Sequence, residues 1–187
     1  SRGENISMKF IETEFEGCYI IEIEKQVDQR GHFARIWDNK ILEKNNLNHN
    51  FVQSSISFNK KKYTLRGMHY QTNPYEEEKL VRCSKGKIFD VIIDIRKKSK
   101  TYNKWIGIEL SEKNSRMIYI PKGMAHGFLT LDDNTEIVYE ISQHYSLEHS
   151  KGIRWNDPKF SIKWPNWSPI LSEKDSKYVD FKDSEIS

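Results

Sequence analysis

The feature that most constrains the fold of this chain is a series of short strand-like segments separated by turn residues. They are rich in β-branched and aromatic residues, and several alternate apolar with polar side chains, which is the pattern of strands with one buried face. Only residues 38–46 read as a helix, with Asp38 as its N-cap. Because almost no helix is available to connect parallel strands, the pattern predicts an all-β antiparallel sandwich or jelly roll. The predicted strands are residues 18–23, 51–58, 65–71, 80–83, 88–95, 105–110, 117–120 and 135–141.

The length of 187 residues is enough for one domain with a substantial core. We expect residues 8–187 to form this domain, and residues 1–7, a polar stretch ahead of Met8, to be an added leader outside the fold. The tail carries Trp155, Trp164 and Trp167 among prolines. It is expected to be an ordered loop that covers the barrel, because several tryptophans left in water would favour aggregation.

The charges of the chain are nearly balanced, since 30 basic against 27 acidic residues give a net charge of +3. This balance argues against a broad basic field for nucleic acid, and the lysines at 60–62 are expected to be solvated loop charges. No apolar run is long enough to span a membrane. Cys18 and Cys83 suggest neither a zinc motif nor a disulfide framework. We therefore expect a soluble cytoplasmic protein without nucleic-acid or membrane partners.

The segment Leu65–Gln71 is the first candidate for a site. In a regular strand, Leu65, Gly67, His69 and Gln71 share one face, opposite Arg66 and the other intervening residues. A histidine on such a face titrates near neutral pH and can move protons. A hydrogen-bonded core histidine is the alternative, and the segment alone leaves both interpretations open.

A second motif, residues 121–126, has the spacing P-x-G-x-x-H and resembles half of the pattern of the cupins, a superfamily of jelly rolls. Metal-binding cupins supply two histidines one residue apart and then a carboxylate from the other half. Here Gln71 replaces the second histidine, and Lys79 would repel a divalent cation. The sequence therefore favours a site without a metal, and a metal-dependent cupin is the minor alternative.

Taken together, the motifs resemble those of the dTDP-4-dehydrorhamnose 3,5-epimerase family. They follow the family's order with nearly its spacing and cover most of the chain between Met8 and Asp175. The resemblance is highly specific for the family and less specific for the substrate. The matching pieces are residues 30–33, 65–71, 79–83, 90–91, 94–96, 120–128, 139, 155–157, 164–165 and 171–175.

This resemblance implies a cupin-type jelly-roll homodimer without metal or cofactor. It would invert C3 and C5 beside the keto group of a nucleotide-linked 4-keto-6-deoxyhexose, in the synthesis of bacterial polysaccharide precursors. A hydrogen α to a ketone is acidic because the carbanion is delocalised onto oxygen. Acid–base chemistry therefore suffices, with a base, a stabiliser of the enolate and an acid on the opposite face.

The resemblance also implies a role for each catalytic residue. His69 is the base, Asp175 orients its imidazole, Lys79 is the cation beside the keto oxygen, and Tyr139 returns a proton from the other face. Without the resemblance, these would read as a core histidine, a surface aspartate, one charge in a glutamate-rich run and an ordinary strand aromatic. The residues implied in substrate binding are Arg30, Phe33, Gln53, Ser55, Arg66, His126 and Tyr145.

One of these binding residues, Arg66, can share a site with His69 only if the strand between them is irregular. Arg30 and Arg66 match pyrophosphate contacts, a role that suits the planar donors of a guanidinium. Strict alternation puts Arg66 opposite His69, so both reach one site only if Gly67 bends the strand or the ligand wraps an edge. For Tyr145, which matches the aromatic that stacks on the base, an ordinary surface tyrosine is the alternative, and His126 is alternatively a core residue.

Departures from the family pattern leave the substrate open. Arg35 and Ser150 stand at or near positions where glutamate is common, and Ser55 stands where asparagine is common. These positions belong to the expected nucleotide contacts, so the base, the sugar configuration and the number of inverted carbons stay undetermined. The alternatives are an epimerase that inverts one carbon of another nucleotide sugar, and a carbohydrate-binding jelly roll without turnover.

Overall fold

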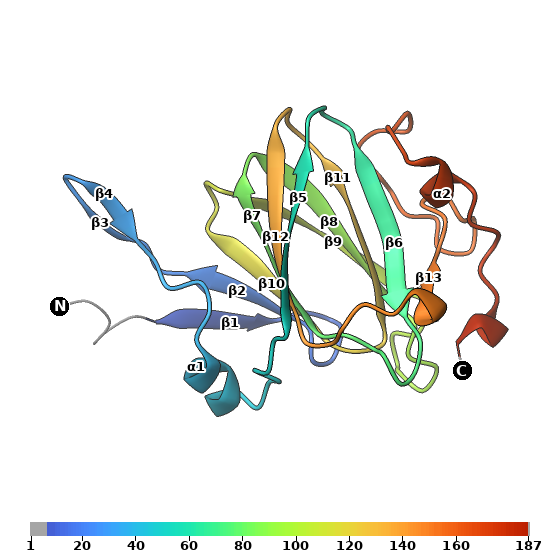
Figure 1. Cartoon of the computed structure of the whole chain (residues 1–187), viewed down its shortest axis with the longest axis horizontal. Coiled ribbons are helices and arrows are strands. Elements are labelled where there is room, and N and C mark those ends of the chain that lie inside the picture. The colour runs from blue at the N-terminus through green and yellow to red at the C-terminus, as the bar shows by residue number, and fades with distance from the viewer. Residues whose placement is uncertain (1–6, 187) are drawn as a thin grey trace.

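Two antiparallel β-sheets face each other and enclose the core of the protein (Figure 1). The computed structural model describes residues 7–186. All the strand pairings within its sheets are antiparallel, and the helices are short. The predicted all-β jelly roll is therefore confirmed.

Within each sheet, the order of hydrogen-bonded neighbours differs from the order of the strands in the sequence. The six-stranded sheet contains, from one edge to the other, β1 (Met8–Glu12), β2 (Tyr19–Ile23), β10 (Arg116–Ile120), β7 (Lys79–Lys85), β12 (Thr135–Ile141) and β5 (Gln53–Asn59). The five-stranded sheet contains β13 (Ser150–Gly152), β6 (Leu65–Gln71), β11 (Met124–Thr130), β8 (Lys87–Asp94) and β9 (Trp105–Ser111). A separate hairpin joins β3 (Gln26–Asp28) to β4 (Gly31–Phe33). The helices are α1 (Asn39–Lys44), α2 (Glu173–Ser176) and the 3-10 turns η1 (Leu147–His149) and η2 (Asp183–Glu185).

Each predicted strand segment contains a strand, and the predicted helix is α1. The Asp38 carboxylate caps α1 by accepting hydrogen bonds from the backbone N–H groups of Lys40 and Ile41. Strand β11 was not predicted, because all its residues are buried and a strand buried on both faces does not alternate. The predicted leader lies outside the described residues except for Ser7, whose hydroxyl donates a hydrogen bond to Glu24.

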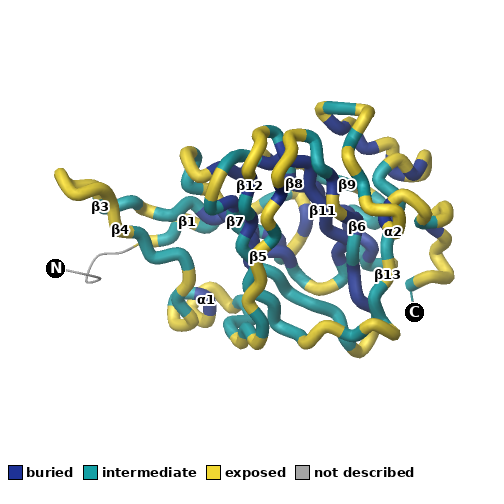
Figure 2. Tube along the Cα trace, turned by 45° about the horizontal axis from the view of Figure 1, so that its top comes forward, coloured by how far each residue is buried: buried dark blue, intermediate teal, exposed yellow. Residues whose placement is uncertain are grey.

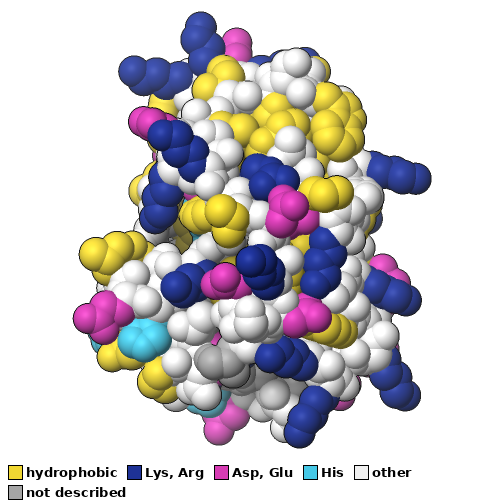
Figure 3. Space-filling view, turned by 90° about the vertical axis from the view of Figure 1, so that its right-hand side faces the viewer, with side chains coloured by type: hydrophobic (Ala, Val, Ile, Leu, Met, Phe, Trp, Pro, Cys, Tyr) yellow, Lys and Arg dark blue, Asp and Glu magenta, His cyan; other side chains and the backbone are white. Residues whose placement is uncertain are grey.

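The C-terminal tail covers the outer face of the five-stranded sheet. Trp164 is only 4% exposed, and its indole N–H donates a hydrogen bond to the backbone oxygen of Trp155. Trp167 remains 61% exposed. The prediction of a covering loop is thus right for Trp164 and wrong for Trp167. On the face that includes this tail, side chains of both charge signs are interspersed (Figure 3), as expected from the balanced composition.

The hairpin β3–β4 projects away from the barrel (Figure 1), and most of it is exposed (Figure 2). Val27 and Phe33 of this hairpin are exposed apolar side chains. We call residues 26–33 the arm.

A bulge at Gly67 changes which side chains of β6 face the inside of the barrel. The pairing of β6 with β11 shifts register there, and Gly67 has φ +120, where a Cβ would lie 2.6 Å from the Gly127 Cα. Leu65 and Met68 therefore both pack in the outer core, while Arg66 and His69 both face a cavity between the sheets. The expected shared face of Leu65 and His69 is wrong, whereas the bend that brings Arg66 to the side of His69 is present.

Candidate active site

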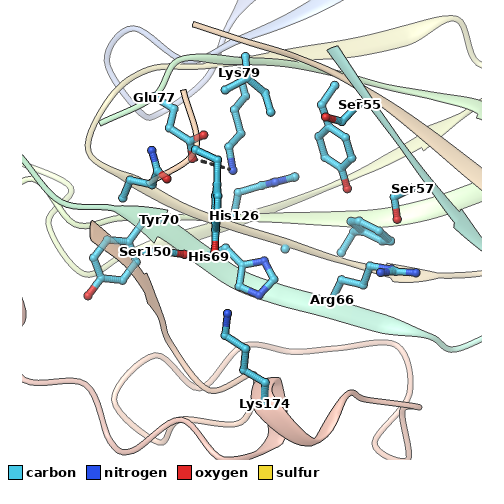
Figure 4. A pocket seen from close by; sticks show the side chains of 16 residues that line it. Ser55, Ser57, Arg66, His69, Tyr70, Glu77, Lys79, His126, Ser150 and Lys174 are labelled. Carbon is cyan, nitrogen blue, oxygen red and sulfur yellow. Dashed lines mark ion pairs between the residues drawn. The ribbon is translucent and has the colours of Figure 1, made fainter. Parts of the chain in front are cut away.

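A cavity of about 340 Å³ opens between the two sheets and falls within the size range of small-ligand sites. Strands of both sheets and the C-terminal helix α2 contribute to its wall (Figure 4). The same strands fill the apolar core between the sheets, so the cavity is the polar end of the barrel interior. Its polar lining residues are Ser55, Ser57, Arg66, His69, Tyr70, Gln71, Glu77, Lys79, His126, Tyr139, Tyr145, Ser150 and Lys174.

His69 and Asp175 form a pair at the edge of this cavity. The imidazole Nε2 lies 2.8 Å from Asp175 Oδ1, and the backbone N–H of Gly67 donates to Oδ2 at 3.0 Å. The side chain of His69 is 42% exposed, against 6% for Asp175. Burial of the carboxylate rules out the alternative of a surface aspartate. Since Nε2 is bound to Asp175, Nδ1 is the ring nitrogen left to accept a proton.

The carboxylate of Asp175 stays ionised at neutral pH. Burial alone would raise its pKa, but the hydrogen bond and charge of His69 and the N–H of Gly67 together lower it below the usual range. The short helix α2 presents this carboxylate, because the Ser172 hydroxyl accepts a hydrogen bond from the backbone N–H of Asp175. A permanent negative charge is therefore held against the imidazole.

We predict that Asp175→Asn makes the stability of the protein less dependent on acid. The pKa of Asp175 is lowered in the folded state, so the ionised carboxylate stabilises the fold above the usual aspartate pKa of about 4. That stabilisation is lost as the pH falls through the lower folded value. The free energy of unfolding in urea, measured from neutral pH down to about pH 3, should fall less steeply in the variant than in the parent.

Asp94 provides the internal control for this titration. Burial opposes ionisation of Asp94, but hydrogen bonds from Arg96, Ser99 and Thr101 lower its pKa, so the variant keeps part of the acid dependence. Parallel curves for parent and variant would contradict the prediction.

Two further cavity residues, His126 and Tyr139, lie edge to face with ring centroids 6.2 Å apart. His126 Nε2 lies 2.7 Å from the buried carboxylate of Asp90, so His126 is at once a packed barrel residue and part of the cavity wall. Burial, followed by the charge of Asp90, raises the pKa of Tyr139 above its usual range. The phenol therefore keeps its proton at neutral pH, as a proton donor must.

Two lysines reach the cavity from opposite sides of His69 (Figure 4). Lys79 is largely buried and lies 3.4 Å from Glu77, and Lys174 extends from α2. Lys79 is an expected site residue, whereas Glu77 and Lys174 were not predicted. The only sequence signals were that Lys174 directly precedes Asp175 and that Glu77 lies two residues before Lys79.

Four of the expected binding residues line the cavity, namely Ser55, Arg66, His126 and Tyr145. The cavity is also lined by Ser150, one of the departures from the family pattern. Ser57 was missed, although it shares a strand face with Ser55. Gln53 lies just outside the lining, where its side chain accepts a hydrogen bond from the backbone N–H of Tyr145.

Arg30 and Phe33, expected to bind substrate, do not line the cavity of their own chain. Both lie on the projecting arm, and Arg30, with 82% of its side chain exposed, pairs with the neighbouring Asp28. Within the described residues, β3 and β4 pair with each other and with neither of the two sheets that surround the cavity.

Other kinds of site find little support in the described part of the chain. Within residues 7–186, no three or more His, Cys, Asp or Glu side chains gather as a metal site would require. Cys18 and Cys83 are buried free thiols. None of the helices in this range has the length and hydropathy needed to cross a bilayer.

Comparison with known proteins identifies close relatives. A family model described as dTDP-4-dehydrorhamnose 3,5-epimerase matches residues 12–183. The dTDP-4-dehydrorhamnose 3,5-epimerase of Shigella flexneri is 43% identical over 177 residues, covering 92% of this chain and 97% of the relative. The crystal structure of the Bacillus anthracis protein of that name, with TDP and PPi bound, has a TM-score of 0.91 at 41% identity, and the match covers 94% of this chain and 100% of that one. The structure of dTDP-6-deoxy-D-glucose-3,5-epimerase from Legionella pneumophila, in complex with dTDP-4-keto-L-rhamnose, has a TM-score of 0.87 at 36% identity and covers 92% of each chain.

Proposed function

The chain belongs to the dTDP-4-dehydrorhamnose 3,5-epimerase family, and we propose that it inverts C3 and C5 of a nucleotide-linked 4-keto-6-deoxyhexose of the dTDP-4-dehydro-6-deoxyglucose type. The single observation that carries the proposal is that a carboxylate-paired imidazole, a protonated phenol and an ammonium group line one cavity. These are the base, the acid and the enolate stabiliser that epimerisation beside a ketone requires.

In the first step, His69 removes the proton from the carbon next to the ketone. The C–H bond breaks, its electron pair forms the C=C bond of the enolate, and the carbonyl electrons move to oxygen. The ammonium group of Lys79 gains attraction as that oxygen becomes negative, which stabilises the transition state more than the ground state. Asp175 stabilises the imidazolium that results.

In the second step, Tyr139 donates its proton to the opposite face of the same carbon. A new C–H bond forms, the enolate electrons return to the carbonyl, and the configuration is inverted. The phenolate then regains a proton and His69 releases one, so no net proton is consumed. Repeating the sequence at the second carbon beside the ketone completes the double inversion.

The remaining lining residues suit a nucleotide diphosphate. Arg66 and Lys174 bring positive charge to the cavity, which favours a diphosphate, and the planar guanidinium can bind two oxygens at once. The aromatic side chain of Tyr145 is exposed at the cavity, where it can stack on a base. Ser55 and His126 supply hydrogen-bonding groups.

We further propose that the protein is a homodimer in which the arm of one chain reaches the cavity of the other. The family resemblance assigns Arg30 and Phe33 to the substrate, yet the arm projects away from its own cavity. The arm and the outer face of edge strand β5 also expose apolar side chains, among them Val27, Ile56 and Phe58. A second copy would cover these surfaces and complete the site.

Mixing two inactive variants tests this exchange. A mixed dimer of His69→Ala and Arg30→Ala contains one cavity with both residues intact, so the mixture should recover up to about a quarter of the parent activity if subunits assort at random. Sedimentation should show a dimer in each case. If the arm serves its own chain, the mixture will show only the average of the two variants.

We place this function in one domain, residues 8–187, acting in the cytoplasm in the synthesis of bacterial polysaccharide precursors. The two buried cysteines that remain as thiols suit a reducing compartment.

The function is tested by incubating thymidine-, cytidine-, guanosine- and uridine-linked 4-keto-6-deoxy sugars with the protein in deuterated water. Deuterium at C3 and C5, together with inverted configuration at both, is the expected result. Deuterium and inversion at one carbon only would identify a single-centre epimerase. Protection of the protein by a sugar nucleotide without exchange would identify a binding module and overturn the proposal.

A further inference from the structure

Tyr178 lies beside the His69–Asp175 pair without lining the cavity itself. It follows helix α2, the segment that carries Asp175. The rings of Tyr178 and His69 meet edge to face, with centroids 6.2 Å apart and planes at 78°. Tyr178 therefore meets the proposed base through its ring.

The Tyr178 ring also packs against Gly152 of strand β13. A Cβ added at Gly152 would lie only 2.0 Å from Cζ of Tyr178, so the ring packs directly on the backbone of β13. Gly152 is also the residue paired with His69 between β13 and β6. The ring is thus confined between the glycine and the imidazole edge.

The phenol of Tyr178 stays protonated at neutral pH. Burial raises its pKa above the usual range, and the charge of the neighbouring Asp175 raises it further. Tyr178 therefore meets His69 as a neutral aromatic ring.

We propose that Tyr178 is a positioning residue of the epimerase, whose ring, packed on Gly152, holds the imidazole of His69 and so sets the direction of its free nitrogen. This inference rests on the proposed function. An aromatic ring that meets the imidazole edge to face limits its rotation, and a base that is held out of place loses rate without a matching loss of substrate affinity.

Tyr178→Phe and Tyr178→Ala test the ring. Tyr178→Phe keeps the ring that packs on Gly152 and His69, so its kcat and KM should stay close to those of the parent. Tyr178→Ala should lower kcat by about 10- to 100-fold with little change in KM, because the imidazole is no longer held in place. An unaltered kcat in Tyr178→Ala, or an equal loss in Tyr178→Phe, would overturn the role of the ring.

Gly152→Ala tests the ring through a double-mutant cycle. The added methyl group collides with the Tyr178 ring, so it should lower kcat in the parent and cause no further loss in the Tyr178→Ala background, where that ring is absent. Equal losses in both backgrounds would overturn the role of the ring.

The proposed function and the positioning role fail in different ways. Failure of the parent to exchange deuterium would count against the epimerase function, whereas an active parent with an unaltered kcat in Tyr178→Ala would count against the positioning role.

Discussion

Replacing His69 by alanine is expected to lower the turnover of a 4-keto nucleotide sugar by about 10² to 10⁴, the usual contribution of one positioned acid–base group. In the proposed mechanism, every later step depends on removal of the first proton, so epimerisation and deuterium exchange should fall together. Both can be followed in one sample by NMR in deuterated water.

Two companion variants make this result specific. His69→Asn keeps a polar partner for the buried Asp175 carboxylate but cannot accept the proton at neutral pH, so it should show the same loss without added instability. His144→Ala removes an exposed histidine that does not line the cavity and should leave turnover unchanged. An unaffected rate in His69→Asn would remove this imidazole from the mechanism.

The strand pattern was sufficient to predict that His69, Lys79 and Tyr139 lie in strands or at their borders. Each falls in a predicted strand or at its border, and alternation along a strand is a local property that the sequence displays directly. The partner of His69 is different, because Asp175 is 106 residues away. Only the resemblance to a family joined the two residues, since nothing in the tail itself distinguishes Asp175 from a surface aspartate.

Features that depend on a change of local geometry or on tertiary packing could not be predicted in this way. The bulge at Gly67 reverses the alternation of β6, so a regular strand placed Leu65 on the wrong face. Lys174 and Tyr178 reach the site only because the tail folds back over β6 and β13. Arg30 belongs to an arm whose position relative to a site is decided by another subunit in our proposal.

Tyr139→Phe is expected to separate the two halves of the reaction. Exchange of the first proton needs only His69, which can return deuterium to the face from which it took hydrogen, whereas inversion needs a donor on the other face. The variant should therefore lose about 10²-fold or more of product formation while it retains most of the exchange with unchanged configuration. Tyr119→Phe is the matched control, because Tyr119 is also buried and its hydroxyl donates a hydrogen bond to the backbone oxygen of Asn48. If exchange and inversion fall equally in Tyr139→Phe, then Tyr139 acts before the enolate forms or shapes the cavity, and the opposite-face donor has to be sought among the other lining groups.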